Sequence, residues 1–96
     1  MYGTVAKFRI KPGMDAELER LSREQVPQIA GFQFQYVYRL DSDPLDAFLV
    51  VGFESEETYR ANAAGPEQQA RYETFRALLE RDPEWYDGEI SFSIQV

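Results

Sequence analysis

Residues 2–13 read YGTVAKFRIKPG, and this stretch carries the clearest fold signal in the chain. Its side chains alternate between two sets, one of which is the mainly apolar series Tyr2, Thr4, Ala6, Phe8 and Ile10. Alternation with a period of two predicts a β-strand whose two faces differ. Pro12 has no amide hydrogen with which to continue a central ladder, and Gly13 permits a tight turn. The strand is therefore expected to end here, just before a helical pattern begins.

Two helical regions are indicated by apolar spacing and by helix-ending residues. Apolar side chains at i, i+4 and i+7 predict an amphipathic helix over residues 14–26, which Pro27 ends. Ser55 is typical of an N-cap, and the helix it begins runs to about Ala64. Gly65 and Pro66 interrupt this region, so we expect a second helix that starts at Pro66 and stops at Asp82–Pro83.

Three further strands follow from the remaining patterns. One alternating run begins after Gly31, and its expected helix-facing side chains are Phe32, Phe34, Tyr36, Tyr38 and Leu40. The segment Ala47–Phe53 is apolar on both faces, which is typical of a central strand. The last run places Ile90, Phe92, Ile94 and Val96 on one face, and we expect Phe92 to be buried beneath the helices.

The order of these elements predicts an α+β fold. Strand, helix, two strands, a helix pair and a final strand form the ferredoxin-like βαββαβ arrangement, a four-stranded antiparallel sheet with helices on one face. The length of 96 residues suits one domain, covering residues 1–96.

The face of the sheet opposite the helices is expected to be partly apolar. We assign Val5, Val37, Leu49, Val51 and Phe53 to it. Because large apolar patches rarely stay exposed, two sheets packed face to face would form a homodimer, a dimeric α+β barrel. The substitution Val51→Glu should then weaken association. The alternative is a monomer that tolerates the patch.

Composition narrows the possible functions. Seventeen acidic and ten basic residues give a net charge of −7, which disfavours binding to nucleic acid. The chain has no Cys and no His, so it lacks disulfides, imidazole bases and the usual soft metal ligands. We predict a colourless protein with no haem, flavin or metal cofactor. No apolar run is long enough for a membrane span and no leader is evident, so we expect a cytoplasmic protein without membrane contact.

Several of these segments resemble the antibiotic-biosynthesis-monooxygenase family. They are the opening Met1–Gly13, the junction Phe53-Glu54-Ser55 and the helical Tyr59-Arg60-Ala61-Asn62. The resemblance implies a ferredoxin-like fold that forms dimeric α+β barrels. Members include cofactor-free quinone-forming monooxygenases, haem-degrading enzymes and small proteins of unknown role. The haem-degrading branch uses an Asn in the first strand and an iron-binding His, and both are missing here.

The resemblance to the cofactor-free branch points to a candidate site. Asn62 matches that branch's helical Asn in type and approximate place, although Pro66 stands where a Trp is expected one turn later. An amide, a Tyr hydroxyl or an Arg can stabilise the negative charge that develops when a deprotonated phenol reduces oxygen. We expect Asn62 to be catalytic. The expected substrate-binding residues between the helices and the sheet are Tyr59, Tyr72, Phe75 and Trp85.

Each candidate also has a structural explanation. Asn62 lies near a helix end, where Asn commonly forms local hydrogen bonds. Tyr59, Tyr72 and Phe75 can be plain core residues, and Trp85 can cover the core where the last helix meets the final strand. The helical arginines Arg60, Arg71 and Arg76 are expected to pair with nearby glutamates on exposed faces.

Three functions remain compatible with the sequence. The first is a cofactor-independent monooxygenase that acts on a small phenol or hydroquinone. The second is a non-catalytic homodimeric module that binds a small ligand or serves as an accessory protein. The third is an isomerase or decarboxylase of the same fold, which without His needs Asp, Glu, Tyr or Lys as its acid–base group. A cavity walled by Tyr59, Asn62 and Tyr72 favours the first, whereas a fully packed interior favours the second.

Overall fold

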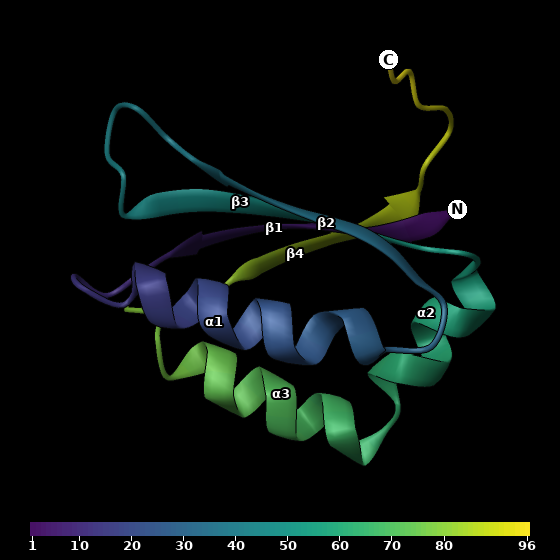
Figure 1. Cartoon of the computed structure of the whole chain (residues 1–96), viewed down its shortest axis with the longest axis horizontal. Coiled ribbons are helices and arrows are strands. Elements are labelled where there is room, and N and C mark those ends of the chain that lie inside the picture. Colours follow the sequence, from purple (N-terminus) through teal and green to yellow (C-terminus); the bar gives the residue numbers. More distant parts are fainter.

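One four-stranded antiparallel sheet, covered by helices on one face, makes up the computed structural model, which describes residues 1–96 (Figure 1). In chain order the elements are β1 (Tyr2–Arg9), α1 (Asp15–Gln25), the 3-10 turn η1 (Val26–Gln28), β2 (Phe32–Arg39), β3 (Asp46–Phe53), α2 (Glu56–Ala63), α3 (Pro66–Arg76) and β4 (Glu84–Glu89). The strand order across the sheet is β2-β3-β1-β4. The predicted α+β, ferredoxin-like βαββαβ fold is confirmed.

Local signals place the ends of the helices. Ser55 caps α2 through its Oγ, which accepts a hydrogen bond from the backbone N–H of Thr58 at 3.2 Å. The Thr58 Oγ1 in turn accepts from the backbone N–H of Ser55, which completes a capping box. Pro66 occupies the first turn of α3, where its missing N–H costs nothing. The turn between β1 and α1 places Gly13 at φ +82°, a conformation that suits glycine.

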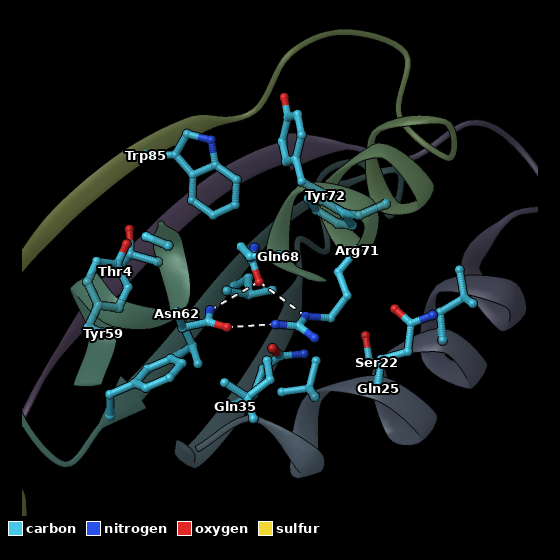
Figure 2. Close-up of a pocket in the computed structure, with 18 of the residues that line it drawn as sticks. Thr4, Ser22, Gln25, Gln35, Tyr59, Asn62, Gln68, Arg71, Tyr72 and Trp85 are labelled. Atoms are coloured by element: carbon cyan, nitrogen blue, oxygen red, sulfur yellow. Dashed lines mark hydrogen bonds between the residues drawn. The ribbon is translucent and has the colours of Figure 1, made fainter. Parts of the chain in front are cut away.

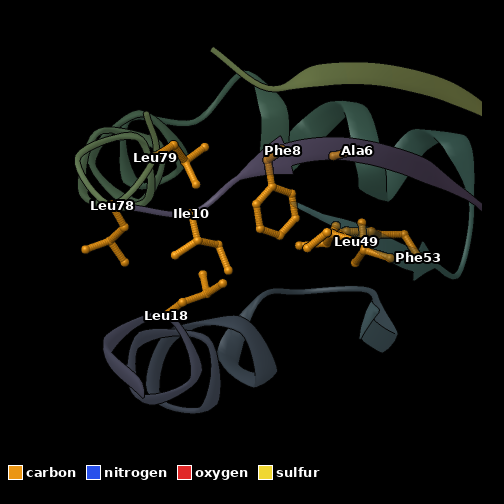
Figure 3. Close-up of a cluster of buried hydrophobic side chains, with 10 residues drawn as sticks. Ala6, Phe8, Ile10, Leu18, Leu49, Phe53, Leu78 and Leu79 are labelled. Atoms are coloured by element: carbon orange, nitrogen blue, oxygen red, sulfur yellow. The ribbon is translucent and has the colours of Figure 1, made fainter. Parts of the chain in front are cut away.

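The hydrophobic core lies between the sheet and the helices (Figure 3). Its buried members are Ala6, Phe8, Ile10, Leu18, Ala47, Leu49, Val51, Phe53, Leu78 and Leu79. Aromatic edges join the two layers, since the ring of Phe8 on β1 meets that of Phe75 on α3 at 5.3 Å in a T-shaped arrangement. The alternation predicted for β1 is confirmed by the burial of Ala6, Phe8 and Ile10.

The prediction that Leu49, Val51 and Phe53 face away from the helices was wrong. Antiparallel pairing sets Leu49 opposite Ala6 and Val51 opposite Thr4, so both share the helix-covered face of β1. Strand β3 is apolar on both faces, and its own pattern therefore cannot say which face is covered. The pairing with β1 decides the matter, and Val51→Glu would place a charge in the core.

The prediction that the alternating aromatic side chains of β2 all face the helices was wrong, because a bulge at the start of the strand changes which face they occupy. Phe32 lies opposite Phe53, and the register then shifts so that Phe34 lies opposite Gly52. Phe32 packs against the core, whereas Tyr36 and Tyr38 are on the open face with 61% and 63% of their surface exposed. The ring of Phe34 lies so close to Gly52 that an added Cβ there would come within 2.4 Å of it.

The final strand is earlier than the sequence pattern predicted. In β4, Trp85 pairs with Ala6 and Asp87 with Thr4, so the strand occupies the free edge of β1 before Ile90 is reached. Residues 91–96 continue beyond the sheet, away from the body of the molecule (Figure 1). The prediction of a buried Phe92 was wrong, because the residue lies beyond β4 and is 77% exposed.

Candidate functional site

A partly open cavity of about 160 Å³ lies between the helices and the covered face of the sheet (Figure 2). Most of its wall is hydrophobic and comes from α1, α2, α3 and all four strands. Its polar lining, apart from the tyrosine hydroxyls, consists of Thr4, Ser22, Gln25, Gln35, Asn62, Gln68 and Arg71. No Asp or Glu lines the cavity, although the chain has 17 of them, and Arg71 is its only charged residue.

Three side chains form a hydrogen-bonded network in the cavity wall. Arg71 donates from Nη2 to the Asn62 Oδ1 at 2.6 Å and from Nε to the Gln68 Oε1 at 3.2 Å. Asn62 donates from Nδ2 to the same Gln68 oxygen at 3.1 Å. The break at Gly65 lets the end of α2 face the first turns of α3, and Gln68 and Arg71 lie one turn apart on α3. The network holds the Asn62 amide in a fixed orientation (Figure 2).

Tyr59 forms part of the cavity wall and is bonded at its hydroxyl. The hydroxyl donates to the Asp87 Oδ1 on β4 at 2.8 Å, and the ring packs at 5.5 Å from that of Phe53. Burial, followed by the bond to Asp87, raises the pKa of Tyr59 to about 12. Tyr59 is therefore a neutral phenol at physiological pH.

Thr4 on β1 brings a further polar atom to this cavity. The residue is 5% exposed, and its Oγ1 makes no well-formed hydrogen bond, although it lies near the hydroxyl of Tyr59. Buried hydroxyls are normally paired, so an unpaired one beside a cavity is a natural contact for a ligand.

An aromatic cluster closes another part of the cavity. The ring of Trp85 lies 6.3 Å from that of Tyr72 and 6.4 Å from that of Phe75. Tyr72 and Phe75 come from α3 and Trp85 from β4, so the cluster spans the helix layer and the sheet. Such faces suit a flat aromatic ligand. Trp85 is also the only tryptophan in the chain.

The structure brings all five sequence-predicted site residues to one cavity, namely Tyr59, Asn62, Tyr72, Phe75 and Trp85. The cavity that was expected to favour an oxygenase is thus present, and the interior is not fully packed. The catalytic and binding roles of these residues remain proposals.

Sequence reasoning missed the partners of Asn62. Arg71 was expected to pair with a glutamate, and Glu67 four residues earlier has the right spacing, yet Arg71 bonds to Asn62 and Gln68 instead. Arg60 does pair with Glu56, at 3.5 Å, whereas Arg76 pairs with Asp82. One signal was available for the missed residues: positions 68, 71, 72 and 75 share the i, i+3, i+4, i+7 stripe of α3 that faces the interior.

Neither a metal-binding cluster nor a membrane-spanning helix is found in the structure. No group of three His, Cys, Asp or Glu residues is arranged to hold a metal ion. None of the helices combines the length and the apolar character that a membrane crossing requires.

Solved structures with this fold are numerous, although no protein-family model and no curated protein matches the sequence. SnoaB, a cofactor-independent oxygenase from Streptomyces nogalater solved as an Asn-to-Ala variant, has a TM-score of 0.79 at 16% identity, covering 97% of this chain and 95% of that one. A Deinococcus radiodurans protein provisionally named an antibiotic biosynthesis monooxygenase has a TM-score of 0.76 at 15% identity, covering 100% and 98%. A similarly named Chloroflexus aurantiacus protein has a TM-score of 0.69 at 21% identity, covering 98% of both chains.

The chain has the antibiotic biosynthesis monooxygenase fold. The similarity extends over nearly the whole length of each of these solved chains. At such low identities the likeness concerns the fold alone, and activity has to be argued from the side chains of the cavity.

Proposed function

We propose that this protein is a cofactor-independent monooxygenase that acts on a small phenol or hydroquinone. One observation carries the proposal: the cavity joins an aromatic wall to the fixed donors of Asn62 and Arg71. The fold shared with a named cofactor-independent oxygenase supports it. The cavity lining contains no imidazole, carboxylate or lysine, so only tyrosine hydroxyls could serve as acid–base groups for an isomerase or decarboxylase.

The reaction requires the phenol to be deprotonated and held in a dry, oriented state. A hydrogen bond donated by the Asn62 amide to the phenol oxygen would favour the phenolate form. The phenolate then passes electrons to oxygen. For a phenol with a free para carbon, phenol and O₂ give quinone and water. One oxygen atom enters the ring, the other leaves as water, the ring is oxidised and O₂ is reduced.

Asn62 has the geometry of a donor for the reduced oxygen. Its Nδ2 carries two hydrogens, and only one hydrogen bond from it, to Gln68, is present. The second hydrogen can serve a substrate or a peroxide oxygen. Arg71 and Gln68 hold the amide in place, so little reorganisation is needed when charge develops.

Oxygen consumption with a panel of phenols and hydroquinones tests the proposal. We expect turnover with at least one substrate and a loss of about 10²–10³-fold in Asn62→Ala, the usual effect of removing one preorganised donor. Gln69→Ala, which removes an exposed amide of α3 outside the cavity, is the control and should keep full activity. Equal rates in Asn62→Ala and the unmodified protein would remove Asn62 from the mechanism. No consumption with any substrate would favour a binding module.

We also propose that two copies pair through the open face of the sheet. Three of the residues first assigned to this interface, Leu49, Val51 and Phe53, lie in the core, so the proposal rests on Val5 and on residues not assigned before. Exposed large side chains on the open face are Val5, Tyr36, Tyr38 and Tyr86. The apolar tail side chains Phe92, Ile94 and Val96 add to this uncovered surface. A second copy of the chain would remove both surfaces from water.

A further inference from the structure

Arg71 is one of two arginines without a carboxylate partner, and it is the only one of the two that is partly buried. Six of the eight form salt bridges, namely Arg9, Arg20, Arg23, Arg39, Arg60 and Arg76. Arg81 is exposed, where water can solvate its charge. Arg71 alone combines partial burial with neutral partners. In a chain of net charge −7, Arg71 is a partly buried arginine with no acidic side chain within salt-bridge distance.

The remaining hydrogen-bonding capacity of Arg71 suits an anion. Asn62 and Gln68 accept from two of its five N–H groups, and Nη1 makes no hydrogen bond. Removing a guanidinium from water without an opposite charge is costly, and a planar carboxylate is the partner that its fork geometry matches best. Because no Asp or Glu lines the cavity, a bound ligand is the natural source of that partner.

The size and polarity of the cavity restrict the class of ligand further. An apolar protein cavity of about 150 Å³ accommodates one benzene ring, and the cavity here measures about 160 Å³. The unpaired Thr4 Oγ1 offers a contact for a second polar group, such as a ring hydroxyl. The Tyr72–Trp85 cluster offers faces on which a ring can stack (Figure 2).

We propose that the cavity binds a single-ring aromatic monocarboxylate, with the carboxylate on Arg71 and the ring against Tyr72, Phe75 and Trp85. As a statement about substrate it rests on the proposed oxygenase function, since it makes the substrate a hydroxybenzoate-type phenol. As a statement about binding it stands alone and can be measured without turnover. Arg71 then sets specificity, whereas Asn62 faces the reacting oxygen.

Calorimetric titration with 3-hydroxybenzoate and its neutral amide, 3-hydroxybenzamide, tests this at neutral pH. The two ligands have nearly the same size, so their difference in affinity reports the charge. We expect the acid to bind at least about tenfold more tightly, as for one charge-assisted hydrogen-bonded pair. Quenching of the single Trp85 by the acid would place the ligand in the cavity.

Substitutions separate the charge of Arg71 from its bulk. Arg71→Gln should reduce affinity for the acid by about tenfold or more and reduce that for the amide much less, and Arg71→Lys should lie between. Arg81→Gln makes the same change in net charge away from the cavity and should bind like the unmodified protein. Circular dichroism checks that each variant is folded.

The outcomes distinguish the two proposals. Equal affinity for acid and amide, no binding of either, or an unchanged affinity for the acid in Arg71→Gln would each overturn the carboxylate site. Acid-selective binding without oxygen consumption would uphold this inference and leave the oxygenase proposal without support. Oxygen consumption with neutral phenols and no preference for the acid would support the oxygenase proposal and overturn the carboxylate site.

Discussion

The central strand β3 contributes apolar side chains to both faces of the sheet, yet the two faces differ in burial and in what lies on them. Val50 and Val51 are consecutive residues of β3, but Val51 is buried under the helices whereas Val50 belongs to the open face. The covered face holds the core, the cavity and the network around Asn62. The open face presents tyrosines such as Tyr36 and Tyr38 to the surroundings.

This contrast shows that apolar content alone does not determine which side of a strand becomes the core. The register with β1 determines which face of β3 is covered. Val51 pairs with Thr4 and Leu49 with Ala6, so both lie on the helix-covered face of β1. Once the covered side is set, the helices determine where chemistry is possible, since they supply Asn62 and the rest of the network.

Two single variants, Val51→Glu and Val50→Glu, give the largest expected difference between the covered and the open face. Val51→Glu buries an unpaired charge and should remove several kcal/mol from a total of about 5–15 kcal/mol, so that the chain is largely unfolded. Val50→Glu should leave the fold intact because the open face can solvate the charge. Denaturant unfolding followed by circular dichroism measures both. A larger loss of unfolding free energy in Val50→Glu than in Val51→Glu would show that the covered and open faces are assigned the wrong way round.

Truncation of two phenylalanines compares the core with the tail. Phe8→Ala should lower the free energy of unfolding by about 3–5 kcal/mol, because it opens a cavity beside Phe75 and the helices. Phe92→Ala should change it by about 0.5 kcal/mol or less, as for other exposed sites. Urea unfolding at low protein concentration gives both values. A loss in Phe92→Ala that rises with protein concentration would show that association covers the tail.

The proposed homodimer gives the third test of the comparison. Sedimentation of the unmodified chain at micromolar concentration should show a dimer, and Val50→Glu should shift it to a monomer because like charges would meet across the interface. Gln69→Glu adds the same charge on the exposed side of α3 and should remain dimeric. A monomer for the unmodified chain would refute pairing through the open face.

The sequence was sufficient where a pattern had only one interpretation. The strict alternation from Thr4 to Ile10 predicted β1 and its buried face, and Ser55 and Pro66 predicted where α2 and α3 begin. It was insufficient where the deciding contact is distant in the sequence. Strand β3 is apolar on both sides, and the bulge after Phe32 is a property of strand pairing that no local period reveals.

The last strand and the site show the same limit. Residues 84–89 read EWYDGE, which is a weak strand pattern, yet they pair with β1. The tail that follows alternates well but finds no partner in the chain. In the site, the resemblance to a known family pointed to Asn62. Arg71 was instead expected on an exposed face, because its spacing from Glu67 favours a salt bridge. Only the packing of α2 against α3 shows where its guanidinium points.

The last prediction concerns the loss of stability at alkaline pH. It tests whether burial on the covered face raises the pKa of one hydroxyl, that of Tyr59. The pKa of Tyr59 is raised from 10.0 to about 12, first by burial and then by its bond to Asp87. Below pH 10 the phenol is protonated in both the folded and the unfolded chain, so its full contribution to stability is present. As pH rises from 10 to about 12 the unfolded chain releases this proton before the folded chain does, and stability falls.

Tyr59→Phe should therefore lose less stability than the unmodified protein across this window, since it removes one group that resists ionisation when folded. The measurement is the free energy of unfolding at pH 9 and at about pH 12, with phenolate absorbance followed in parallel to identify the late-titrating tyrosine. Asp87→Asn retains the phenol but removes the acceptor's charge, and should reduce the effect without abolishing it, because burial is the larger cause. If the unmodified protein and Tyr59→Phe lose stability in parallel, the hydroxyl of Tyr59 is solvated and the covered face is wetter than its packing against Phe53 indicates.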